Sequence, residues 1–226
     1  MKSGPRGRIP TIQEIARQRD APLKKSIFGV TLTDVMEIQE ESDPNLKIPK
    51  IVPILTKAVE ELEGFNIEGI FRVPGDTEQV LALRVQMDNG NYEIHADDAN
   101  IPASLLKLWM RELEDPIVPV HLYEQCIQSC MKDEDNIKGA IEVLNLLPEV
   151  NRLTGLYVIS FLRKVAQPQY QAKNKMSINN LAMVFAPNFL RCPSEDPQII
   201  FENTKYEQAW LRALLNGVEH PPDVGL

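Results

Sequence analysis

Cysteine and histidine are scarce in this chain of 226 residues, and neither is arranged as a set of ligands. The three cysteines, Cys126, Cys130 and Cys192, include no CxxC pair, and an odd count without paired spacing does not indicate a disulfide framework. The three histidines do not lie at zinc-ligand spacing from the cysteines. We therefore expect reduced, intracellular thiols and no metal site.

Long apolar runs are also missing. No segment approaches the ~18 consecutive apolar residues that a membrane-spanning helix needs, and no apolar core follows the first basic residues. The sequence thus predicts neither a transmembrane segment nor secretion. We expect a cytoplasmic location, with recruitment to a membrane or the cytoskeleton left to other domains of a longer protein. With 43% apolar and 25% charged residues, the composition is globular.

Positive charge is rare outside the first 25 residues. Residues 1–25 hold seven basic and two acidic residues, a net charge of +5, whereas the other 17 basic and 30 acidic residues give −13. Phosphate contacts need clustered lysine and arginine, so this acidic body is not expected to bind nucleic acid. We interpret residues 1–25 as a basic leader, which is either a solvated linker or a segment that contacts an acidic membrane or another part of a longer protein.

Strand patterns are equally weak, because no stretch alternates cleanly between apolar and polar residues. Apolar residues instead recur at spacings of three and four, which is typical of amphipathic helices. The sequence predicts a single all-α domain over residues 26–216 and a C-terminal tail over residues 217–226. Helices are expected at about 48–64, 77–90, 101–113, 122–131, 137–147, 150–165, 178–187 and 198–216.

Four residues are candidate helix boundaries. Asp76, with a glutamine three residues later, and Ser177 are predicted to cap helix starts. Gly64 and Pro187 are predicted to end helices. A helix that stops at Pro187 leaves Asn188 at a turn, where its amide could satisfy backbone groups or donate to a loop of a partner.

The nucleotide-binding loop GxxxxGK[ST] and the hydrolase motifs HExxH and GxSxG are absent. A short loop between two predicted helices, EGIFRVPG at residues 68–75, has glycines near both ends and is stiffened by Pro74. Arg72 is its only cation. The loop could present Arg72 to a partner, or Arg72 could simply pair with Glu68 or Glu78.

Lys107 and Arg111 lie one turn apart on the predicted helix 101–113. Apolar side chains occupy most of the rest of this helix, so the two cations form a narrow stripe. The stripe could be a solvated edge, which every bundle helix needs somewhere. A binding role is favoured because this acidic body has few cations.

Six segments are informative together: FGVTL (28–32), IPKIV (48–52), EGIFRVPG (68–75), LLKLWMRELEDPIVP (105–119), NKM (174–176) and NLAMVFAPN (180–188). They occur in the order found in RhoGAP domains, which are GTPase-activating domains for Rho-family small GTPases. The sequence resembles this family over about residues 26–216. The segment PTIQEIA near the N-terminus is similar to the stretch that joins a MyTH4 domain to a RhoGAP domain in Vilse-type (CrossGAP) proteins.

The resemblance implies a helical bundle that docks on the switch loops of GTP-loaded Rac, Cdc42 or Rho and speeds GTP hydrolysis. By similarity, Arg72 is the arginine finger inserted into the active site of the partner. Lys107 and Arg111 would support the finger loop or contact the switch loops, and Asn188 would contact the partner near the nucleotide.

The same resemblance implies no cofactor for this chain, because the partner GTPase holds GTP and Mg. The chain is expected to be a monomeric activator without a substrate site of its own. Gly69 would allow close approach of the loop, and Pro116 would shape the turn after the basic helix. Two positions depart from the family pattern: Pro74 stands where serine is usual, and Thr31 stands where proline is usual.

Two other readings stay open. One is a RhoGAP fold that binds GTPases or other signalling proteins without accelerating hydrolysis. The other is a helical scaffold whose cations form surface ion pairs. Because non-catalytic relatives often lack the finger, Arg72 favours a GTPase activator, and the similarity to Vilse-type proteins favours Rac or Cdc42.

Overall fold

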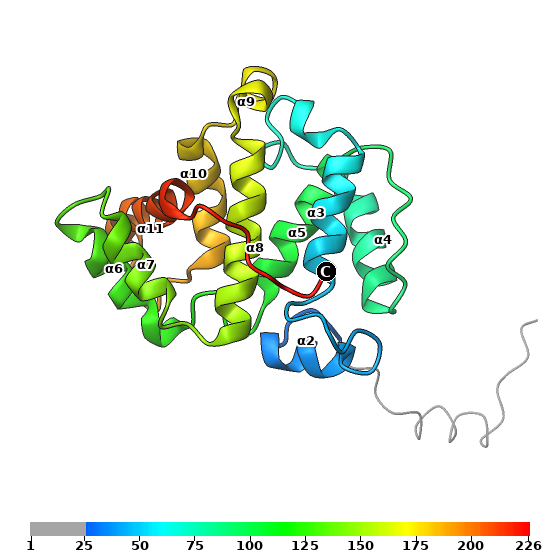
Figure 1. Cartoon of the computed structure of the whole chain (residues 1–226), viewed down its shortest axis with the longest axis horizontal. Coiled ribbons are helices and arrows are strands. Elements are labelled where there is room, and N and C mark those ends of the chain that lie inside the picture. The colour runs from blue at the N-terminus through cyan, green and yellow to red at the C-terminus, as the bar shows by residue number, and fades with distance from the viewer. Residues whose placement is uncertain (1–25) are drawn as a thin grey trace, which may run out of the picture.

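A computed structural model describes residues 26–226, and this part of the chain is helical with no strand (Figure 1). The predicted all-α class is therefore confirmed. Leu32–Gln39 and Pro168–Asn174 form two short helices that the periodicity of the sequence did not indicate. The elements are α2 (Leu32–Gln39), α3 (Ile51–Glu61), η1 (Gly64–Asn66), α4 (Thr77–Asp88), α5 (Asn100–Glu112), η2 (Val120–Leu122), α6 (Tyr123–Met131), α7 (Ile137–Leu144), α8 (Glu149–Val165), α9 (Pro168–Asn174), α10 (Ile178–Phe189) and α11 (Pro197–Gly217).

Helix α8 runs through the middle of the molecule, with α6, α7 and α11 on one side of it and α3, α4 and α5 on the other (Figure 1). The apolar residues of α8 are buried along most of the helix, which agrees with its central position. Helix α11 packs against α6, α7 and α10, and α5 packs against α3, α4 and α10. One continuous core links these groups.

The predicted helix caps are present. The side chain of Asp76 accepts a hydrogen bond from the amide of Gln79 at the start of α4, and that of Ser177 accepts one from the amide of Asn180 at the start of α10. Thr31 forms a reciprocal capping box with Asp34 at the start of α2. The threonine at the position where the family usually has proline therefore starts a helix.

The two predicted stops are wrong in detail. Helix α3 ends at Glu61, and the left-handed residue that follows is Glu63, with φ 57°, rather than Gly64. Helix α10 continues through Pro187 to Phe189. A proline in the last turn removes only one hydrogen bond, and the amide of Leu190 still donates to the carbonyl of Ala186 at 2.9 Å.

Residues 217–226, assigned to a tail, return to the body of the molecule after α11. Val224 is 3% exposed and packs with Ile48 and Leu153. Its carbonyl accepts a hydrogen bond from the amide of Lys47 at 2.9 Å. The end of the chain thus covers the connection between α2 and α3. The leader, residues 1–25, lies outside the described residues.

Among the described residues, no helix has the length and apolar character to cross a membrane.

Candidate functional site

The loop of residues 68–75, called here the Arg72 loop, is fixed at both ends by backbone hydrogen bonds. The amide of Gly69 donates to the carbonyl of Asn174 at 2.8 Å, and the amide of Gly75 donates to Oγ of Ser104 on α5 at 2.9 Å. Within the loop, the amide of Arg72 donates to the carbonyl of Gly69 at 2.8 Å. The loop is therefore a tight turn held between α5 and the last residue of α9.

Gly69 is required at its position by both conformation and space. Its φ of +75° is a left-handed value that favours glycine. A Cβ atom there would lie 2.9 Å from Cγ2 of Val73 and 3.4 Å from Nη2 of Arg72. The guanidinium of Arg72 thus lies over the backbone of Gly69, and a larger residue would push against it.

Phe71 anchors the middle of the loop. It adopts a left-handed backbone with φ 68° although it is not glycine, and its side chain is fully buried. The ring makes edge contacts with Phe161 and Phe185, at centroid distances of 5.9 and 5.1 Å. Because this conformation costs a non-glycine residue of the order of 1–2 kcal/mol, the aromatic packing must hold it. With Phe71 buried, the next side chain, Arg72, is exposed.

Lys107 contacts the same residue from α5. Its Nζ atom donates a hydrogen bond to the carbonyl of Phe71. Burial lowers the pKa of the Lys107 ammonium, and the positive charge of Arg111 lowers it further. The two cations of the stripe are therefore close together, and the stripe reaches the Arg72 loop through Lys107.

Arg72 and Arg111 have no acidic partner among residues 26–226: no carboxylate there forms an ion pair with either. The pairing of Arg72 with Glu68 or Glu78, which the sequence left open, does not occur. In contrast, Arg84 of α4 binds Glu112 at 2.8 Å on a neighbouring part of α5. The exposed cations of this surface are thus open to an external anion.

Asn188 and Pro116 lie on the two chain segments that meet beside α5. Asn188 is 5% exposed within the last turn of α10, and its Nδ2 donates to the carbonyl of Val184 at 2.9 Å. The turn predicted for Asn188 is therefore wrong, because α10 does not stop at Pro187. Pro116 is buried, and two residues later the amide of Val118 donates to the carbonyl of Phe189 at 2.9 Å.

Asn174 is a residue of this region that sequence reasoning did not single out beyond the NKM segment. It is fully buried, and its Nδ2 donates to the carbonyls of Phe65 and Val165, each at 3.0 Å. Its Oδ1 accepts from the amide of Met176 at 2.7 Å, while its own carbonyl holds Gly69. Nothing in the sequence distinguishes this asparagine from an exposed one, since its partners are distant backbone groups.

The chemistry available to this surface is recognition of an anion. A guanidinium keeps its charge at all relevant pH values and offers a planar set of donors to phosphate oxygens. Arg72 holds such a group at the surface on an ordered turn. In the described residues, no three histidine, cysteine or acidic side chains are grouped as metal ligands.

Known proteins are similar to this chain in sequence and in fold. The sequence profile of the RhoGAP domain matches residues 49–194. GTPase activating protein homolog 3 of Dictyostelium discoideum is 38% identical over 196 residues, which are 86% of this chain and 14% of that protein. Rho GTPase-activating protein 22 of Mus musculus is 35% identical over 223 residues, which are 95% of this chain and 31% of that protein. The chain thus spans less than a third of the length of these relatives.

A solved structure agrees with these sequence matches. The crystal structure of human Rho GTPase activating protein 15 aligns with a TM-score of 0.75 at 27% identity. The alignment covers 92% of this chain and 97% of that chain. The helical arrangement described above is therefore shared over nearly the whole of both chains.

Proposed function

Since the chain belongs to the RhoGAP domain family, we propose that it binds a GTP-loaded Rho-family GTPase and accelerates GTP hydrolysis by inserting Arg72 into the active site of that partner. The observation that carries the proposal is that Arg72 is exposed on an ordered loop and unpaired within residues 26–226. This residue is exposed, has no ion pair among the described residues, and follows a buried residue on a loop fixed at both ends. An arginine that only stabilised the fold would have an acidic or carbonyl partner.

Arg72 would act on charge that develops during hydrolysis. In phosphoryl transfer, negative charge is spread over the oxygens around the γ-phosphate, and a positioned arginine stabilises it. Positioning matters as much as charge, because a group already held in place loses little entropy when the complex forms. The hydrogen bonds at Gly69, Phe71 and Gly75 supply that positioning.

The other site residues have supporting roles in this proposal. Lys107 holds the carbonyl next to Arg72, and Gly69 leaves room for the guanidinium. Arg111 contacts the switch loops of the GTPase, and Asn188 and Pro116 shape the adjoining surface. Asn188 would support this surface mainly by stabilising the last turn of α10, because its side-chain amide already donates to the carbonyl of Val184.

The chain would need no cofactor of its own, since GTP and Mg are held by the GTPase. It would act as a monomeric domain in the cytoplasm, as the activator of an enzyme rather than as an enzyme with its own substrate. Rac and Cdc42 are the preferred partners through the similarity to Vilse-type proteins. Other domains of a longer protein would recruit it to a membrane or the cytoskeleton.

Single-turnover GTP hydrolysis by Rac, Cdc42 and Rho, with the wild-type domain and with Arg72→Ala, tests the proposal. We expect the variant to lose most of the acceleration, which is about 10³–10⁵-fold for an arginine finger in the related Ras system. Binding to the GTP-loaded partner should persist. Equal rates for the two proteins would contradict an arginine finger, and binding without acceleration by the wild type would identify a non-catalytic binding module.

A further inference from the structure

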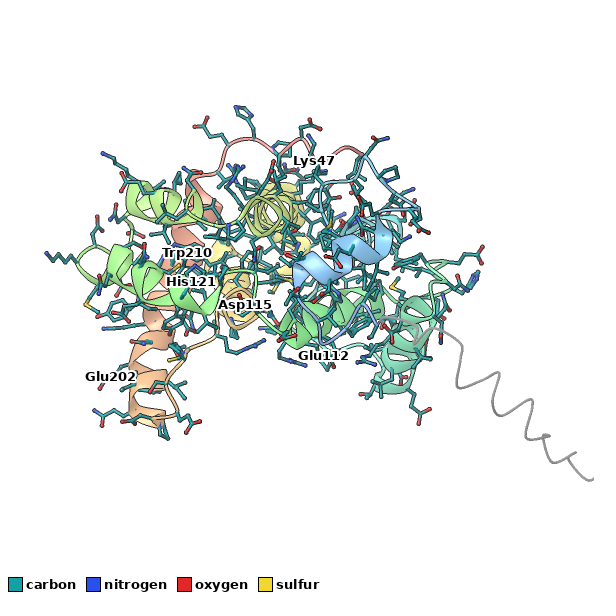
Figure 2. All side chains as sticks on the ribbon, turned by 90° about the horizontal axis from the view of Figure 1, so that it is seen from below. Lys47, Glu112, Asp115, His121, Glu202 and Trp210 are labelled. Atoms are coloured by element: carbon teal, nitrogen blue, oxygen red, sulfur yellow. The ribbon has the colours of Figure 1, made fainter. Side chains whose placement is uncertain are left out.

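Arg191 lies in the connection between α10 and α11 and places its guanidinium against the C-terminal end of α5. Its Nη2 donates to the carbonyls of Arg111 and Leu113, each at 2.9 Å, and its Nη1 donates to the carbonyl of Glu114 at 3.1 Å. One side chain thus binds three carbonyls within residues 111–114. In Figure 2, Glu112 and the nearby Asp115 mark this end of α5.

The end of α5 needs such a partner. The last carbonyls of a helix have no intrahelical donors, and they carry the negative end of the helix dipole. The last turn of α5 contains one basic residue, Arg111, whose side chain is exposed. A guanidinium satisfies several carbonyls at once because its donors are fixed in one plane, whereas an ammonium is a single point of charge.

The backbone that carries Arg191 is itself fixed. The amide of Leu190 donates to the carbonyl of Ala186 at 2.9 Å, which closes the last turn of α10. One residue earlier, the carbonyl of Phe189 accepts a hydrogen bond from the amide of Val118 at 2.9 Å. Arg191 therefore joins two rigid ends, that of α10 with Asn188 and that of α5 with Arg111.

We propose that Arg191 is a positioning residue of the GTPase-binding surface, which acts by holding the last turn of α5 and so fixing where Arg111 meets the partner. This inference rests on the proposed function. The Arg72 loop is held elsewhere, by Ser104, Lys107 and Asn174. Loss of Arg191 should therefore weaken docking of the GTPase and leave the hydrolysis step in the bound complex nearly unchanged.

A double-mutant cycle with Arg191→Lys and Arg111→Ala tests this role. Arg191→Lys keeps the charge and removes the planar set of donors. We expect it to raise KM for the GTP-loaded GTPase by about fivefold to tenfold, the range expected for losing charge-assisted hydrogen bonds, with kcat changed by less than about twofold. In the Arg111→Ala background the same substitution should raise KM by less than about twofold, because the residue it positions is gone.

Arg212→Lys is the matched control, because Arg212 binds Glu134 and Asp135 at the connection between α6 and α7. It should leave both KM and kcat unchanged. Additive effects of Arg191→Lys and Arg111→Ala, an unchanged KM, or a fall in kcat alone would each overturn the inference. Arg191→Gln, which keeps one donor group, repeats the cycle if the lysine variant unfolds below the assay temperature.

Failure of the proposed function has a different signature. If the wild-type domain binds a GTP-loaded GTPase without accelerating hydrolysis, the double-mutant cycle uses the dissociation constant in place of KM. Arg191→Lys should then weaken binding in the wild-type background and have little effect in the Arg111→Ala background. If the wild type neither binds nor accelerates any Rho-family GTPase, both the function and the inference are wrong.

Discussion

The Arg72 loop and the connection between α6 and α7 (residues 132–136) both present charged side chains to solvent, but only the second pairs its charges. Arg212 lies between Glu134 and Asp135, at 3.3 and 3.5 Å. Arg72 has no such partner within residues 26–226, although the chain has a net charge of −8 and acidic residues are abundant. An unpaired cation on a firmly held loop is what a site for an external anion requires. A cation on α11 that pairs with the acidic residues of a helix connection contributes to stability instead.

The largest expected effect is on GTP hydrolysis, and it comes from substituting Arg72, with Arg212 substituted in a separate variant for comparison. Arg72→Lys keeps the charge but loses the planar donors. We expect the rate of GTP hydrolysis by the partner GTPase in the presence of this variant to fall by at least about 10²-fold. The free energy of unfolding of this variant should change by less than about 0.5 kcal/mol, because Arg72 is exposed and forms no ion pair with the described part of the chain. Single-turnover hydrolysis and denaturant unfolding measure the two quantities.

Arg212→Ala is the counterpart, and it should leave hydrolysis unchanged while lowering the free energy of unfolding by about 0.5–1 kcal/mol, as for partly exposed ion pairs. Arg72→Lys should thus lose activity and keep its stability, whereas Arg212→Ala should lose stability and keep its activity. A loss of stability in Arg72→Lys, or a loss of activity in Arg212→Ala, would remove the distinction between the two regions.

The next effect concerns Phe71, which makes the Arg72 loop rigid despite its left-handed backbone. Phe71→Ala should lower the free energy of unfolding by about 3 kcal/mol through loss of buried aromatic packing. Phe71→Gly should be less destabilising than Phe71→Ala by about 1 kcal/mol, because glycine has no steric cost at φ 68°. This reverses the usual order of the two substitutions. Urea unfolding of both variants measures it, and the usual order, with glycine worse, would show that the backbone of Phe71 is unstrained.

The contrast between predicted and unpredicted features has a physical basis. The helical class, the caps at Asp76 and Ser177, and the buried face of α8 follow from periodicity and local hydrogen bonding, which act over a few residues. The stop at Pro187 failed because a proline removes only its own hydrogen bond to the residue four positions earlier, and the residues after Pro187 still complete the last turn of α10. Helices as short as α2 and α9 are not stable through propensity alone and depend on tertiary packing, even where a local cap such as Thr31 is present.

The candidate site shows the same division. Arg72, Lys107 and Arg111 stood out because cations are rare in this body and because the motifs resemble a known family. The residues that fix them, Asn174 and Arg191, bind backbone carbonyls that are distant in sequence. Carbonyls are present at every residue and leave no trace in the sequence, so contacts of this kind become visible only in the fold.

A smaller effect is expected at Lys107, which joins the cationic stripe to the Arg72 loop. Lys107→Met keeps the packing of the side chain but removes the donor to the carbonyl of Phe71. We expect kcat/KM for GTP hydrolysis to fall about tenfold, the equivalent of one charge-assisted hydrogen bond. Lys138→Met, which removes an exposed lysine from α7, is the control and should have no effect. An unchanged kcat/KM for Lys107→Met would show that the loop holds its position without Lys107.

The smallest effect extends the comparison to a buried acid, Glu207 of α11, which is 7% exposed and accepts a hydrogen bond from Tyr123 Oη at 2.5 Å. Burial raises the pKa of the Glu207 carboxyl, although the hydrogen bond from Tyr123 opposes the shift. The folded state therefore keeps this proton to a higher pH than the unfolded state. As pH rises from the ordinary range of glutamate through the raised pKa, the free energy of unfolding should fall on account of this residue.

Glu207→Gln keeps a side-chain oxygen for Tyr123 and cannot titrate, so the wild type should lose stability relative to this variant as pH rises through that window. Denaturant unfolding of both proteins from acid to neutral pH measures the difference. Glu202→Gln removes a carboxylate from an exposed position of the same helix and controls for the change in net charge. Parallel stability curves for wild type and Glu207→Gln would mean that Glu207 has the same proton affinity in both states. Hydrolysis rates should follow neither curve, because the carboxyl of Glu207 on α11 binds Tyr123 of α6, whereas the Arg72 loop is held by Ser104, Lys107 and Asn174.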